Sequence, residues 1–117
     1  MSPQPPATPS APNDVLRGTL DLLILKALSL EPMHGWAITQ RLEQLSREAL
    51  RVGQGSLYPA LQRLEEKGWV DSEWKISDQN RHVKFYELTA AGRGALREEA
   101  ATWHRYVELV EVILRTV

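Results

Sequence analysis

The C-terminal stretch of the chain, residues 90–117, constrains the fold more than any other feature of the sequence. Its apolar side chains are spaced alternately four and three residues apart, which is the heptad pattern of a coiled-coil seam: Leu96, Ala100, Trp103, Val107, Val110, Leu114 and Val117. At ~1.5 Å per residue such a helix is on the order of 40 Å long. A compact domain of about 100 residues has a radius of gyration of only ~13 Å, so much of this helix should project beyond its own domain.

A projecting seam of this kind predicts a homodimer, because an isolated chain could not bury it. Tyr106 and Ile113 broaden the apolar face. Charged residues of both signs lie off the seam, as they do on a solvated helix face: Arg93, Arg97, Glu98, Glu99, Glu108 and Glu111. The alternative is that the helix folds back on the core of its own chain.

A first helix is predicted from about residue 14 to the Glu31-Pro32 pair, since the residue before a proline disfavours the helical region. Its surface is apolar on nearly all sides, and such a helix is buried on more than one side. In so small a domain the second surface could belong to another subunit. We therefore expect one stripe of this helix to join the dimer interface: Leu16, Leu20 and Leu23.

A second helix is predicted over residues 34–50, with Trp36, Ile38, Leu42 and Leu45 on its inner face. A third follows the glycines of "VGQGSLYPALQRLEEKGWV".

Proline inside a helix removes a hydrogen-bond donor and clashes with the preceding turn. If Ser56 is the N-cap, however, Pro59 falls in the first turn, where the amide has no intrahelical acceptor. Leu57, Leu61 and Leu64 would then face inward, and Gly68 would end the helix.

The apolar period then changes from helical to strand-like. Val70, Trp74 and Ile76 recur at even spacing, the polar residues "SDQNR" form a turn, and residues 82–88 return as the second strand of a hairpin. Thr89 is placed to cap the last helix. Three helices, a hairpin and a final helix are the parts of a winged helix-turn-helix, in a mainly α (α+β) fold. The predicted divisions are a disordered Pro-rich tail (1–13), the winged domain (14–89) and a dimerisation helix (90–117).

The motifs "GTLDLLILKALSLEPMHGWAI", "GQGSLYPALQRLEEKGWV" and "YELTAAG" resemble those of the PadR family of transcriptional regulators, in its short form with one C-terminal helix. The resemblance implies a homodimeric repressor that binds a palindromic site in double-stranded DNA. In some PadR-like regulators, aromatic residues at the dimer interface stack flat ligands. A small aromatic effector would here contact Trp36, Trp103 and Tyr106, although Trp103 could instead simply pack against its mate or the first helix.

The start of the third helix is the predicted recognition element, because in a helix-turn-helix these residues contact base edges in the major groove. The hairpin would be the wing and would contact the minor groove or the backbone. The expected DNA contacts are Gln54, Ser56, Tyr58, Pro59, Arg63, Lys67, Lys75, Arg81, His82 and Lys84. The alternatives are that Tyr58 is a core aromatic and that the hairpin is only a solvated polar ribbon.

The rest of the sequence argues against catalysis. His34, His82 and His104 fall on different elements without metal-ligand spacing, Glu65-Glu66 is interpreted as a solvated helix face, and no catalytic or cofactor motif is present. We therefore expect no enzyme, no metal and no cofactor.

The near-neutral formal charge of −1 keeps one alternative open, a winged-helix protein-interaction module with little DNA affinity. The first dozen residues lack the features of a secretory signal. The longest apolar run, Leu22 to Leu25, is far too short to span a membrane, and there is no cysteine. These features predict a cytoplasmic protein.

Overall fold

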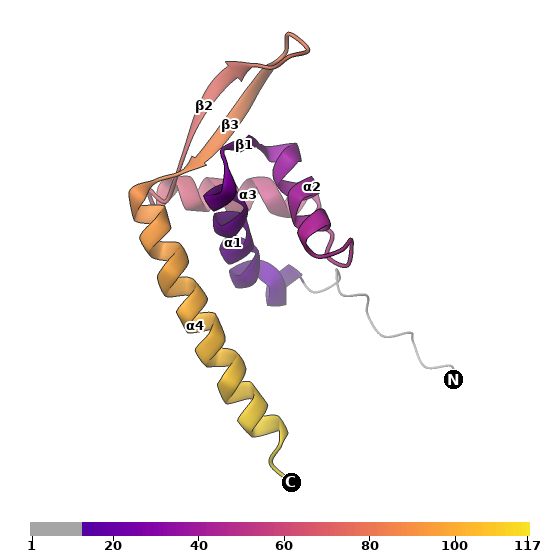
Figure 1. The fold of residues 1–117 in the computed structure, drawn as a ribbon, viewed down its shortest axis with the longest axis vertical. Helices are drawn as coiled ribbons and strands as arrows, with labels where there is room; N and C mark the ends of the chain where they lie inside the picture. Colours follow the sequence, from indigo (N-terminus) through magenta and orange to yellow (C-terminus); the bar gives the residue numbers. More distant parts are fainter. Residues whose placement is uncertain (1–12) are drawn as a thin grey trace, which may run out of the picture.

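The computed structural model describes residues 13–117, with side chains from residue 18 onward. The elements are α1 (Asn13–Leu30), β1 (Met33–His34), α2 (Gly35–Leu45), α3 (Gln54–Glu66), β2 (Val70–Ile76), β3 (His82–Leu88) and α4 (Ala90–Leu114). Helices α1–α3 form a globular unit, from which the β2–β3 hairpin and α4 extend in different directions (Figure 1). This arrangement confirms the predicted winged helix-turn-helix. Of the predicted tail, residues 1–12 lie outside the described residues, and Asn13 is already the first residue of α1.

Helix α1 lies at the centre of the core and contacts α2, α3, α4 and β3. Ile24 and Leu25 are completely buried, as is almost all of Leu28. The apolar character on nearly all sides of α1 is therefore used mostly within one chain. This corrects the interface prediction for Leu20, which is buried in its own core, while Leu23 packs partly buried against that core. The side chain of Leu16 is outside the described part.

Helix α2 buries a narrower face than predicted. Its start is capped by His34, whose Nδ1 accepts a hydrogen bond from the Ala37 amide at 3.2 Å. The buried positions follow the helical repeat from the first residue of α2: Gly35, Ile38, Thr39 and Leu42. Trp36, two residues before Ile38 and so across the helix, is 55% exposed, and Leu45, the last residue, is 54% exposed. Their assignment to the inner face was wrong.

Helix α3 begins earlier than predicted. The N-cap is Gly53, not Ser56, and Gly53 O accepts hydrogen bonds from the amides of both Ser56 and Leu57. Pro59 is consequently the sixth helical residue, in the second turn, and lacks the amide that would donate to Gly55 O. The prediction that Pro59 loses nothing was therefore wrong. Because Gly55 is exposed, water can reach its carbonyl in place of the missing donor.

The C-terminal end of α3 is confirmed at Gly68, which has a left-handed φ of 76°. The Gly68 amide donates to Glu65 O, and the Trp69 amide donates to Leu64 O, at 2.9 and 3.0 Å. These two bonds form a Schellman motif, which favours glycine because a Cβ is strained at that φ.

Strands β2 and β3 pair from Val70↔Leu88 at the base to Ile76↔His82 near the tip, and β1 adds to the other edge of β3. The short strand β1 was not predicted. Val70 and Leu88 are buried, whereas Trp74 and Ile76 are 66% and 63% exposed. The predicted strands are thus confirmed, but the hairpin extends beyond the core. Its apolar residues near the tip are therefore not covered by the rest of the described chain.

Helix α4 is anchored only at its start. Thr89 Oγ1 caps it by accepting from the Gly92 amide at 2.9 Å, as predicted. Gly92 packs so closely against the Trp69 carbonyl that an added Cβ would collide with it, which accounts for the glycine of the "LTAAG" segment. Only Gly92 and Ala95 are buried in α4, and Leu96 is partly buried against the core. The rest projects, as predicted, and the molecule is 57 Å long.

Candidate nucleic-acid interface

The first turns of α3 form an exposed and uncharged surface. Gln54, Gly55, Tyr58 and Pro59 are exposed, Ser56 is half-buried, and the first turn has no acidic residue. Gly53 has no side chain with which to cap the helix. The first amides therefore point outward at the positive end of the helix dipole, where anionic groups are favoured.

Tyr58 connects this surface to α2. A Cβ added to Gly35 would lie 2.7 Å from Tyr58 Oη and 2.9 Å from its Cε1, so the ring rests directly on the glycine backbone. Yet Tyr58 is 43% exposed. Tyr58 therefore combines features of both alternatives, a packed aromatic and an exposed candidate DNA contact. One side of its ring packs on α2, and the rest of the side chain faces solvent.

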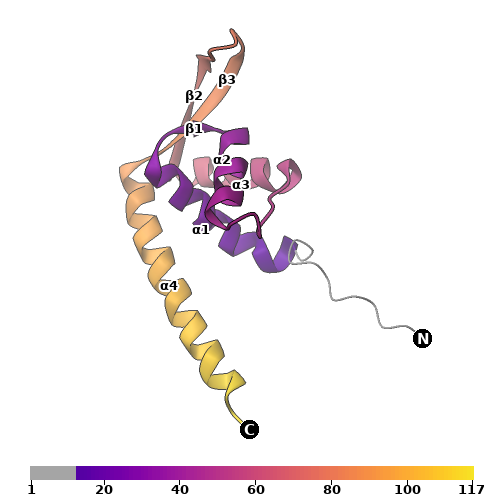
Figure 2. The same ribbon diagram turned by 45° about the vertical axis from the view of Figure 1, so that its right-hand side comes forward.

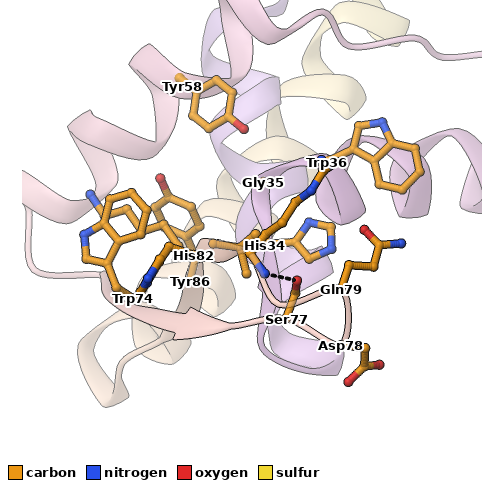
Figure 3. A pocket seen from close by; sticks show the side chains of 13 residues that line it. His34, Gly35, Trp36, Tyr58, Trp74, Ser77, Asp78, Gln79, His82 and Tyr86 are labelled. Atoms are coloured by element: carbon orange, nitrogen blue, oxygen red, sulfur yellow. Dashed lines mark hydrogen bonds between the residues drawn. The ribbon is translucent and has the colours of Figure 1, made fainter.

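A groove of about 630 Å³ separates the start of α3 from the wing. In Figure 3, Tyr58 of α3, Trp36 of α2 and Trp74 of β2 surround it from different sides, and His82 and Tyr86 lie between them. Burial raises the pKa of the Tyr86 phenol, and Glu65 and Tyr58 raise it further, so this side chain is neutral at physiological pH. Trp74 was not among the predicted DNA contacts, because its strand spacing predicted a side chain that faces the core.

The predicted cations of the wing differ in availability. Lys75 Nζ lies 3.4 Å from a Glu73 carboxylate oxygen and over the Phe85 ring, and Lys84 is paired with Glu65. Arg81 and His82 are exposed near the tip, and neither side chain forms an ion pair with any residue in the described part of the chain. Lys67, just past the end of α3, stacks over the Trp69 ring with Nζ 4.6 Å from its centroid.

Glu65 joins the recognition helix to the wing. Its Oε2 accepts a hydrogen bond from Ser72 Oγ of β2 at 2.9 Å, and its Oε1 lies 3.6 Å from Lys84 Nζ of β3. The prediction that Glu65 lies on a solvated helix face was therefore wrong. Its side chain fixes both strands of the hairpin relative to α3. This role could not be predicted from local spacing, because both contacts depend on the tertiary placement of the hairpin.

Arg63 turns toward the core side of α3 instead of toward solvent. Its Nη2 donates to Asp21 Oδ1 of α1 at 2.8 Å, and both side chains are largely covered. Arg63 therefore helps to hold α3 on α1, and this ion pair makes it less available for a DNA contact than the exposed cations of the wing.

The predicted dimer seam is exposed along most of α4. Ala100, Val107 and Val110 are half-buried, whereas Trp103 is 40% and Leu114 74% exposed. The predicted ligand pocket does not form within one chain, because Trp36 lines the groove beside the wing while the other two residues lie on α4. Trp103 and Tyr106 are neighbours there, with ring centroids 6.5 Å apart.

A family profile described as "Transcriptional regulator PadR-like family" matches residues 24–98, which is more than half of the chain. The chain belongs to the PadR family of transcriptional regulators. It is 41% identical to the transcriptional regulator Rv3488 of Mycobacterium tuberculosis over 83 residues, covering 71% of this chain and 74% of that protein. PadR proteins are DNA-binding regulators and not enzymes, so the predicted regulatory, non-enzymatic character is confirmed.

Solved structures give the same fold. A PadR-family regulator from Eggerthella lenta is 34% identical, with a TM-score of 0.76 over 89% of this chain and 88% of that chain. A transcriptional regulator from Clostridium thermocellum has a TM-score of 0.80 over 87% of this chain and 99% of that chain, and at 22% identity it supports the fold alone.

None of the helices in the described part has the length and apolar content needed to cross a membrane. Among the side chains of residues 18–117, no group of three or more His, Asp or Glu residues is arranged to hold a metal ion.

Proposed function

We propose that this PadR-family protein is a homodimeric repressor that binds a palindromic operator in double-stranded DNA. The observation that carries the proposal is the surface shared by the start of α3 and the wing. It joins an exposed, acid-free helix N-terminus to a hairpin with exposed cations across one open groove. A helix start of this kind suits the major groove, and the wing suits the adjacent backbone or minor groove.

On this surface, α3 and the wing contact different parts of the DNA. Gln54, Ser56 and Tyr58 reach base edges or phosphates, and Pro59 presents a rigid apolar edge. Arg81 and His82 contact the phosphate backbone from the wing, and binding can also redirect Lys67, Lys75 and Lys84 from their partners within the chain to phosphates. The Lys75–Glu73 pair is exposed on both sides, and surface ion pairs of this kind are worth about 0–1 kcal/mol, so exchanging it for a phosphate contact costs little.

The dimer follows from α4. A second copy covers the exposed seam and supplies a second recognition helix. Two such helices about one DNA turn apart, roughly 34 Å, read two half-sites related by two-fold symmetry. The stripe formed by Leu96, Ala100, Trp103, Val107, Val110 and Leu114 is the proposed interface, and the partly buried Leu23 of α1 is proposed as a further part of it.

The same interface provides the place for an effector. Trp103 is 40% and Tyr106 60% exposed, and the two rings are adjacent, so a flat aromatic molecule bound between the copies would stack on them. Such binding would alter the spacing of the two recognition helices and thereby release the operator.

The test is selection of bound sequences from random duplex DNA by the purified full chain at moderate salt. The proposal predicts a palindromic consensus that a Tyr58→Ala, Arg81→Ala double variant no longer selects, while an Arg105→Ala variant on α4 still does. Transcription downstream of such sites should rise when the protein is removed. Weak binding without a consensus would overturn the proposal and favour the protein-interaction module.

A further inference from the structure

We infer that Trp74 and Ile76 form an apolar contact with the minor groove of DNA, through which the wing responds to the shape of that groove. The inference rests on the proposed function and extends it to two residues whose strand spacing had predicted burial. The observation behind it is that both side chains are largely exposed, although both are large and apolar.

The strand register places these two residues on a defined face of the wing. Trp74 is paired with Lys84, and Ile76 with His82, and directly paired residues of an antiparallel ladder project from the same face. Nearer the base, the same face carries Tyr86, which is buried, and Ser72, which bonds to Glu65 of α3. The exposed apolar pair is therefore the outward continuation of the face that packs on the recognition helix.

The surroundings of this face favour a polyanion as its occupant. Arg81, His82 and Lys84 line the same groove as Trp74, and the acidic side chain in that lining is Asp78. Lys84 also pairs with Glu65 below. Across the groove stands Tyr58, at the start of the helix proposed to enter the major groove. A duplex held there by α3 would bring its adjacent minor groove to the wing.

The fold also argues against a second copy of the chain as the occupant. The β2–β3 hairpin and α4 leave the globular unit in different directions in both views (Figures 1 and 2). A dimer that buries the α4 seam therefore leaves the face of the hairpin with Trp74 and Ile76 accessible to a ligand.

Apolar side chains in the minor groove contact the deoxyribose edges and can wedge between base steps. Such a contact adds no hydrogen-bond readout, so it depends on the width and deformability of the groove. The N2 amino group of guanine projects into the minor groove and would obstruct it. The flanks of each half-site contacted by the wing should accordingly favour A·T over G·C.

The first test measures the affinity of the full chain for its selected duplex as a function of salt. Trp74→Ala should weaken binding by about ten- to hundredfold at every salt concentration, because an apolar contact releases no counterions. Trp74→Phe should restore much of the affinity. Arg81→Ala is the contrasting variant, since loss of a phosphate contact lowers the slope of log K against log salt by about 1. Because Trp74 is exposed, the thermal midpoint should not change.

The second test replaces flanking A·T pairs by G·C or by inosine·cytosine, which lacks the N2 amino group but resembles G·C in the major groove. Wild-type protein should bind the G·C duplex more weakly and the inosine duplex normally, and Trp74→Ala should not discriminate between them. Equal affinities of wild type and Trp74→Ala, or a Trp74→Ala variant that loses binding together with its salt slope, would overturn the inference alone. Failure of the wild type to select any duplex would overturn the proposed function as well.

Discussion

Helices α3 and α4 carry the same kind of apolar repeat and use it in opposite ways. In α3, Leu57, Leu61 and Leu64 are at most 1% exposed and form the centre of the core. In α4, Ile113 and Leu114 are 69% and 74% exposed. The comparison teaches that periodicity identifies the side chains of a helix that need burial, whereas length and position decide whether the same chain can provide it.

Truncating one apolar side chain in each helix tests this difference between α3 and α4. Leu61→Ala should lower the free energy of unfolding by about 2–5 kcal/mol at every protein concentration, since it opens a cavity inside one chain. Leu114→Ala should destabilise only the dimer, so its effect should disappear on dilution into the monomer range. Chemical denaturation at several protein concentrations measures both effects. A concentration-independent loss at Leu114 would place that residue in the core of a single chain.

A charge introduced into the apolar seam of α4 should prevent dimerisation. Val110→Glu should raise the dimer dissociation constant by about 100-fold or more, because a carboxylate would be buried without a partner. Arg105→Glu introduces the same side chain off the seam and is the matched control, with the dimer retained. Sedimentation velocity separates the two results. A Val110→Glu dimer of ordinary affinity would show that the seam lies elsewhere.

The smallest effect is expected at the functional end of α3. Gly35→Ala would displace the Tyr58 ring, since the new Cβ would lie 2.7 Å from Tyr58 Oη. We expect the fold to be retained and DNA affinity to fall about tenfold, as for loss of a hydrogen bond to a charged group. Gly18→Ala is the control, because an added Cβ there meets nothing within 4 Å. Fluorescence anisotropy with labelled duplex measures both variants, and equal affinities would remove Tyr58 from the interface.

Features that depend on local backbone geometry could be predicted from the sequence. The two strands of the hairpin, the Thr89 cap and the glycine at position 68 are examples, because each is specified by residues a few positions apart. The exception is the start of α3, where Gly53 serves as the cap and places Pro59 one turn deeper than expected.

Burial and pairing between elements were less predictable. Trp74 follows the expected strand period but is exposed, because no other part of the described chain covers it. Trp36 is exposed because it lies across α2 from the buried positions of that helix. Arg63 lies on the predicted recognition helix but pairs with Asp21, 42 residues away in the sequence. Such contacts depend on how α1, α3 and the wing are placed in space, which local spacing does not encode.

Whether a second copy covers the exposed seam of α4 is measured by sedimentation equilibrium of the wild-type chain over a range of micromolar concentrations. We expect the mass of two chains, shifting toward the mass of one chain only on dilution. A mass of one chain at every concentration would contradict this expectation.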